Sequence, residues 1–255
     1  MLLSAKEVES TKTFATKLEG IQIANWVKSG NSADDVFKAL KLDQTGDKLF
    51  ESPMFTYWSS FVAKRYSNNP GSEMFSTFGL HYTDEALAKI LPTKILISAK
   101  NVDSTKAQAT KLEGLQISNW INGDKSADDV FKLLKLDETG DELFKSPLFS
   151  TWTTFVTKIN KNNYEADIFK LLTDKLGDAA LARMISAANN VDDTKKLATG
   201  LRAEQFTSWF SAGKTPQNVD TLLNAAANSD DMTKKISQDY AKFFEKADER
   251  LSMVN

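Results

Sequence analysis

The sequence predicts an all-α protein built as an array of tandem helical repeats, and three observations lead to this fold class. A long block of residues occurs twice, with Trp26 and Trp120, and likewise Trp58 and Trp152, separated by 94 residues. Apolar residues recur at three- and four-residue intervals, which is the spacing of one helix face. No segment alternates polar and apolar residues as a half-buried strand does.

The amino-acid composition argues against several classes of function. The 255 residues are 41% hydrophobic and 26% charged, with a net charge of -2, so we expect no nucleic-acid or membrane partner. The chain has no cysteine and one histidine, His81, which leaves no basis for a zinc site or a Ser-His-Asp triad unless His81 itself serves. No apolar run approaches the roughly 20 residues of a membrane-spanning helix. We expect no cofactor and no metal.

The first helix of each copy is expected at 10–28 and at the equivalent positions further on. One face of this helix, here called the stripe, carries the same residue types in each copy. The stripe is also present in a third, degenerate copy, in which Trp209 follows Trp120 by 89 residues. The stripe includes a glutamine, for which we expect a buried amide that bonds nearby backbone groups. A threonine precedes each stripe and is expected to cap the helix. The recurring positions are Thr11/105/194, Ala15/109/198, Leu18/112/201, Gln22/116/205 and Trp26/120/209.

Two further helices of the first copy are expected at 32–42 and 53–67. Ser32 followed by Asp35 is a capping pair, and it places acids in the first turn, where the helix dipole favours them. Pro53 suits the first turn of the next helix because no hydrogen bond needs its missing N–H. Trp58 and Phe61 lie on the buried stripe of that helix.

The fourth and fifth helices are expected at 72–80 and 83–98. Residues 95–99 join the first two copies without a Gly-, Ser- or Pro-rich linker, so we expect rigid stacking and an elongated array. The predicted units are 1–95, 96–187 and a partial third unit, 188–255.

Recurring large apolar side chains at helical spacing are expected to form the core, because burying an aromatic ring is worth several kcal/mol. The predicted core consists of Leu18, Trp26, Val36, Leu40, Trp58, Phe61, Leu112, Trp120, Val130, Leu134, Trp152, Phe155, Leu201, Trp209 and Tyr240.

The repeated block resembles the tandem LWY units of oomycete RXLR effectors. The residues that carry this resemblance are the Trp, the Ser-Ala-Asp-Asp-Val-Phe-Lys segment and the later Ser-Pro-x-Phe-x-x-Trp segment. The resemblance covers 1–190, and more weakly 191–255, where Tyr240 replaces the second tryptophan. It implies five-helix units joined into stiff arrays.

The resemblance also implies a function. Members of the family are secreted by plant pathogens, enter host cells and bind host proteins to suppress immunity or RNA silencing, without enzymatic activity as a class. Some recruit the scaffold subunit of protein phosphatase 2A, so that subunit is one implied partner. The sequence shows no secretion signal and no Arg-x-Leu-Arg element, so we expect a mature or cloned fragment, the alternative being that the implied cell biology is wrong. We expect a monomer, and the resemblance implies the host cytoplasm or nucleus as its place of action.

Two segments look like the front of a calcium loop, but the match fails further on. After Asp43 and Asp137 the sixth positions are Lys48 and Glu142 instead of glycine, and the position of the bidentate glutamate is apolar. Both segments are therefore expected to be turns between helices, with a left-handed glycine.

Function is expected where the copies differ on their surface. Arg65 and Tyr66 replace Ile159 and Asn160 of the second copy, and Arg and Tyr are common at binding hot spots. Together with His81 they are our predicted protein-binding residues, on a surface that at least two units form together. For Phe14, Tyr57 and Tyr66, which are aromatic where the second copy is polar, packing against 72–82 or an upstream unit is the alternative. An enzyme with an unrecognised site is the alternative function.

Overall fold

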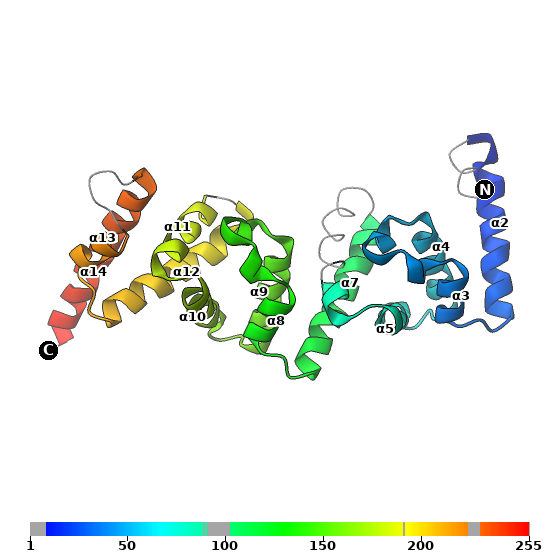
Figure 1. The fold of residues 1–255 in the computed structure, drawn as a ribbon, viewed down its shortest axis with the longest axis horizontal. Coiled ribbons are helices and arrows are strands. Elements are labelled where there is room, and N and C mark those ends of the chain that lie inside the picture. The colour runs from blue at the N-terminus through cyan, green and yellow to red at the C-terminus, as the bar shows by residue number, and fades with distance from the viewer. Residues whose placement is uncertain (1–8, 89, 91–102, 191, 224–229, 255) are drawn as a thin grey trace. The chain divides into compact units, whose positions relative to one another are not determined.

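The computed structural model describes residues 9–88, 90, 103–190, 192–223 and 230–254. Every regular element within these ranges is a helix, so the predicted all-α fold is confirmed (Figure 1). The chain forms two compact units, Met1–Leu134 and Lys135–Asn255.

The first copy begins with a long helix and continues with shorter ones. Ser32 caps the second helix: its hydroxyl accepts the N–H of Asp35 at 3.1 Å, and the Asp35 carboxylate accepts the N–H of Ser32 at 2.9 Å. The elements are α2 (Glu9–Lys28), α3 (Ala33–Ala39), the 3-10 helices η1 (Leu42–Gln44) and η2 (Gly46–Glu51), α4 (Pro53–Arg65) and α5 (Pro70–His81).

The second copy repeats this order. Its elements are α7 (Asp103–Asn122), α8 (Ala127–Leu133), η3 (Leu136–Glu138), η4 (Gly140–Lys145), α9 (Pro147–Ile159), α10 (Tyr164–Leu176) and α11 (Asp178–Ala188). The third copy contributes α12 (Asp192–Ser211), α13 (Pro216–Leu222) and α14 (Asp231–Val254).

The helix expected at 32–42 ends earlier, at Ala39. Lys41 adopts a left-handed backbone conformation with φ 56°, which a right-handed helix cannot continue, and Lys135 does the same in the second copy with φ 52°. Gly46 and Gly140 are also left-handed, as expected of the two segments that resemble calcium loops.

The other predicted boundaries are close to the observed ones. The helices expected at 53–67 and 72–80 span Pro53–Arg65 and Pro70–His81. Of the helix expected at 83–98, residues 83–88 and 90 are described; residues 84–88 and 90 are helical, and Thr83 precedes the helix.

The core of the first copy is a cluster of aromatic rings. Trp58 and Phe78 lie 5.6 Å apart between ring centroids, and Phe37 packs edge-on against Trp58 at 4.9 Å. The buried Trp58 indole donates a hydrogen bond of 2.8 Å to the carbonyl of Ala33. This bond ties α4 to the first turn of α3.

The first helices of the three copies differ in how much of their stripe is covered. Helix α7 packs against α5, and α12 packs against α10, α11 and α14. Trp120 and Trp209 are almost completely buried, and Trp209 contacts Phe206 and Tyr240. Helix α2 packs against α4, and Trp26 keeps part of its surface exposed although its ring contacts Tyr57 and Phe61. Leu18 and Leu40 are also partly exposed, whereas all the other residues of the predicted core are buried.

The stripe glutamine has a different environment in each copy. Gln22 is exposed, and the Nε2 group of buried Gln205 donates to the carbonyl of Asp178 at 3.4 Å. Gln116 is buried, and neither of its amide atoms has a hydrogen-bond partner among the described residues. The expected amide-to-backbone bond is therefore found only at Gln205.

Candidate functional site

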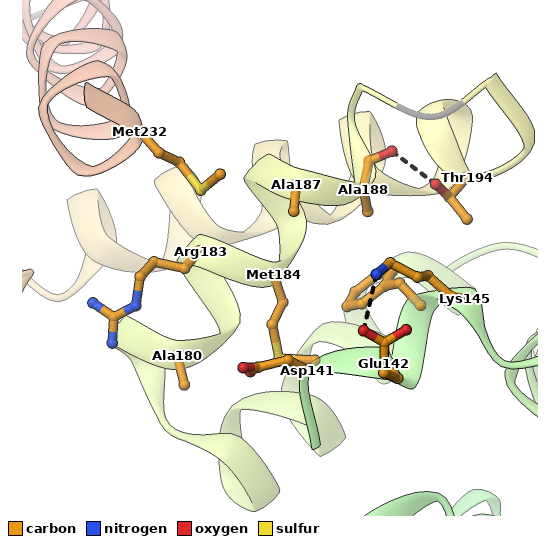
Figure 2. Close-up of a pocket in the computed structure, with 11 residues that line it drawn as sticks. Asp141, Glu142, Lys145, Ala180, Arg183, Met184, Ala187, Ala188, Thr194 and Met232 are labelled. Carbon is orange, nitrogen blue, oxygen red and sulfur yellow. Dashed lines mark hydrogen bonds and ion pairs between the residues drawn. The ribbon is translucent and has the colours of Figure 1, made fainter. Parts of the chain in front are cut away.

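The second compact unit contains a groove of about 680 Å³ that the sequence analysis did not anticipate (Figure 2). It lies between η4, α11 and the first turns of α12 and α14. The lining residues are Asp141, Glu142, Phe144, Lys145, Ala180, Arg183, Met184, Ala187, Ala188, Thr194 and Met232.

The floor of the groove is apolar and built from small or flexible side chains. Met184 is 8% exposed and Phe144 is 6% exposed, and Ala180, Ala187 and Ala188 of α11 also line the groove. Met232 lines the groove from α14 (Figure 2). Methionine side chains adapt to differently shaped partners because they are unbranched and polarizable.

The rim carries four charged side chains. Lys145 donates to Glu142 at 2.9 Å, and both of these side chains are largely exposed. The pKa of Asp230 lies below its ordinary value, mainly because its carboxylate accepts a hydrogen bond from the Thr233 N–H. The positive charge of Arg183 lowers this pKa further. Asp141 is exposed and has no ion-pair partner among the described residues. The groove therefore combines an apolar floor with one unpaired carboxylate.

Thr194 lies inside α12, which begins at Asp192, and not at the cap position that the sequence analysis expected. Its hydroxyl donates a hydrogen bond of 2.7 Å to the carbonyl of Ala188 (Figure 2). The prediction was wrong because the helix starts before the threonine, whose hydroxyl instead satisfies one of the last carbonyls of α11.

No sequence pattern indicated the groove, because its walls come from different copies and no single motif contains them. A signal was nevertheless present in the comparison of the copies. Ala187 and Ala188 of the second copy stand where the first copy has Thr93 and Lys94, which lie outside the described residues. This change from a larger and a charged residue to two small ones marks the position of the groove.

Arg65 and Tyr66 lie together in the first compact unit. They line a shallow pocket of about 440 Å³ with Ser67–Asn69, Ser72 and Glu73. The Arg65 guanidinium lies over the Tyr66 ring at 5.5 Å from its centroid, and Tyr66 packs on the core of the first copy. The arginine is exposed and its environment allows a partner contact.

His81 is not part of that pocket, and most of its surface is engaged within the unit. Its Nε2 atom lies 2.6 Å from an Asp34 carboxylate oxygen, and its ring stacks on Phe37 with centroids 5.1 Å apart. The side chain is 12% exposed. Its surroundings favour a role in holding α5 against α3, because little of the ring is left for a partner.

Metal ions in proteins are held by groups of side chains such as His, Asp and Glu. No group of three or more His, Asp or Glu side chains within these ranges has an arrangement that could hold a metal ion. Among the described helices none combines the length and the apolar character needed to cross a bilayer.

Both copies that carry the repeated tryptophans are all-helical in their described parts, and in the first copy Trp58 bonds the carbonyl of Ala33. The family description "Effector PexRD54, WY-domain" matches residues 21–62 and 115–156, which lie at equivalent positions of the first two copies. The RxLR effector protein PexRD25 of Phytophthora infestans is 32% identical over 227 residues, which cover 86% of this chain and 72% of that protein. The chain belongs to the oomycete RxLR effector family.

Other relatives extend the similarity over almost the whole chain. The RxLR effector protein PSR2 of Phytophthora sojae is 33% identical over 237 residues, or 91% of this chain and 34% of that protein. The crystal structure of PcRxLR12 superposes with a TM-score of 0.73 at 34% identity, covering 96% of this chain and 60% of the other. The chain thus spans about a third of the length of the PSR2 relatives. RxLR effectors are secreted proteins that are translocated into host cells.

Proposed function

We propose that this chain acts inside the host plant cell by binding a host protein, without chemistry of its own, and thereby suppresses host immunity. The observation that carries this proposal is the groove of the second unit. Its apolar floor and charged rim are typical of a surface that recognises another protein. Membership of the effector family supports the same function.

The groove fits the expectation that two copies form the binding surface together. Asp141 and Met184 belong to the second copy, whereas Thr194 and Met232 belong to the third. Because both walls are needed, neither copy alone would present the groove. The copies involved are the second and third, and the groove contains none of Arg65, Tyr66 and His81.

The scaffold subunit of protein phosphatase 2A is the host protein that the family resemblance puts forward. We propose it as the first candidate to measure, with the host cytoplasm or nucleus as the compartment and a monomer as the active form. No feature of the described residues favours an enzymatic function.

Affinity capture from plant-cell extract with the purified chain tests the function, followed by titration with the purified phosphatase scaffold subunit. We expect saturable capture of a host protein by the intact chain and by residues 96–255, and not by residues 1–98. The helicity of each piece is first confirmed by circular dichroism, since 1–98 lacks α7, the packing partner of α5. An intact chain that captures no host protein would contradict the proposal.

A further inference from the structure

We propose that the groove of the second unit binds a single amphipathic helix of the host protein, and that this helix presents a lysine or arginine flanked by apolar residues. The inference rests on the proposed function and names the kind of partner that the site accepts. Shape, flexibility and charge of the groove each support it.

The shape of the groove suits the apolar face of a helix. Ala180, Met184 and Ala187 follow one another at four- and three-residue intervals on α11, so they line one face of that helix. Two of the three are alanines, which allow another helix to approach closely. The volume of about 680 Å³ accommodates several side chains of a bound segment.

The methionines give the groove a floor that can adjust to the partner. Met184 lines it from α11 and Met232 from α14, so a helix that lies along the groove can contact a methionine on each element (Figure 2). Grooves of this kind bind amphipathic helices through residues spaced by three, four and seven positions.

The charge at the rim selects the polar residue of the partner. Glu142 is paired with Lys145, so Asp141 is the rim carboxylate left without an ion-pair partner within the described part of the chain, while the exposed Arg183 lines the groove from α11. A lysine or arginine can lay its aliphatic stem along an apolar floor and still bring its charged end to a carboxylate at the edge. An acidic residue at the same place would be repelled.

Labelling the methionine methyl groups with ¹³C in the intact chain tests the site directly. The probes are two synthetic amphipathic helical peptides with leucine at i, i+4 and i+7, which differ only in having lysine or glutamate at i+3. We expect the lysine peptide to shift the Met184 and Met232 signals and to bind about tenfold more tightly than the glutamate peptide. Met54 and Met74 pack in the first unit and serve as internal references that should not move. Equal affinity for both peptides, or shifts confined to the reference signals, would overturn the proposal.

Asp141→Lys and Asp47→Lys form a matched pair of variants. Asp47 and Asp141 are exposed, occupy equivalent positions of the first and second copies, and lie at the start of the equivalent 3-10 helices η2 and η4. We expect D141K to reverse the preference toward the glutamate peptide and D47K to leave both affinities unchanged. If D141K binds the lysine peptide as tightly as the parent chain, Asp141 does not select the partner.

Ala187→Glu tests the groove independently, because it places a larger, acidic side chain in it. Ala187 is exposed, so we expect the substitution to leave the core undisturbed. If the intact chain captures a host protein and both D141K and A187E capture it equally well, the groove inference fails while the proposed function stands. If the intact chain captures none but the peptide preference holds, the proposed function fails and the groove specificity remains.

Discussion

In the first and third copies, different aromatic residues form a hydrogen bond to the beginning of the short second helix. In the first copy the buried indole of Trp58 donates to the carbonyl of Ala33 at 2.8 Å. In the third copy the buried phenol of Tyr240 donates to the carbonyl of Lys214 at 2.6 Å, just before the start of α13. The repeat therefore needs a large ring with a donor that reaches the beginning of the short second helix, and tryptophan is one of two residues that meet this need.

The first helices of the copies supply a second contrast. Trp120 and Trp209 are almost completely buried, and Trp209 lies in a cluster with Val219 and Tyr240 of its own copy and with Ala182 of α11. Trp26 lies on the same stripe, but α2 packs against α4 and the indole stays partly exposed. The equivalent tryptophans of the three copies thus differ in how much of the indole is buried.

Trp120→Ala should have the largest effect on stability. Removing a completely buried indole leaves a cavity and is expected to cost about 3–5 kcal/mol. Trp26→Ala should cost clearly less, because part of that ring already contacts solvent. Urea unfolding followed by circular dichroism measures both variants, and equal losses would contradict the expected effect of this difference in burial.

Tyr240→Phe tests the hydrogen bond that replaces the tryptophan bond. The ring remains, but the carbonyl of Lys214 loses its donor, so we expect a loss of about 1–2 kcal/mol. Burial raises the pKa of Tyr240, which agrees with a phenol that stays protonated and donates. Hydrogen exchange should report faster opening of α13 and α14, with α3 and α4 unchanged as the internal control. Unchanged exchange in α13 would show that the bond is dispensable.

Much of this fold followed from local chemistry that the sequence displays. The capping serines, the prolines at helix starts and the apolar stripes predicted the helices to within a few residues, apart from the early end of α3. That end depends on the left-handed backbone of Lys41, a conformation that lysine rarely adopts and that no residue pattern indicated.

The groove and the place of His81 could not be predicted in the same way, because both depend on contacts between distant segments. Asp34 and His81 are 47 positions apart, and only the packing of α3 against α5 brings them together. Asp141 and Met232 are further apart still and belong to different copies. Helical periodicity identifies which residues face a core, but not which surfaces of two copies meet at one groove.

The helix caps of the first and third copies should respond differently to acid. Asp35 caps α3, and its hydrogen bonds with Ser32 hold its pKa below the ordinary value of 3.8, whereas Asn218 makes the equivalent cap of α13 and does not titrate. A lowered folded-state pKa stabilises above 3.8, and this contribution is lost as the pH falls through the folded value. We expect hydrogen-exchange protection of α3 to fall below about pH 4 and Asp35→Asn to remove much of that change. A cap of α13 that is equally sensitive would contradict this assignment.

Lys145→Ala should have the smallest effect on stability and a measurable one on binding. The Lys145–Glu142 pair is 68% and 69% exposed, and a surface pair of this kind contributes about 0–0.5 kcal/mol. Removing the lysine leaves Glu142 unpaired beside Asp141, so the rim of the groove becomes more negative. The lysine peptide should then bind more tightly and the glutamate peptide more weakly, with the difference shrinking at high salt. Lys158→Ala, at an exposed position of α9 outside the groove, is the control, and should change neither the unfolding curve nor either affinity. If K145A and K158A have the same effect on peptide affinity, the charge of the rim does not govern recognition.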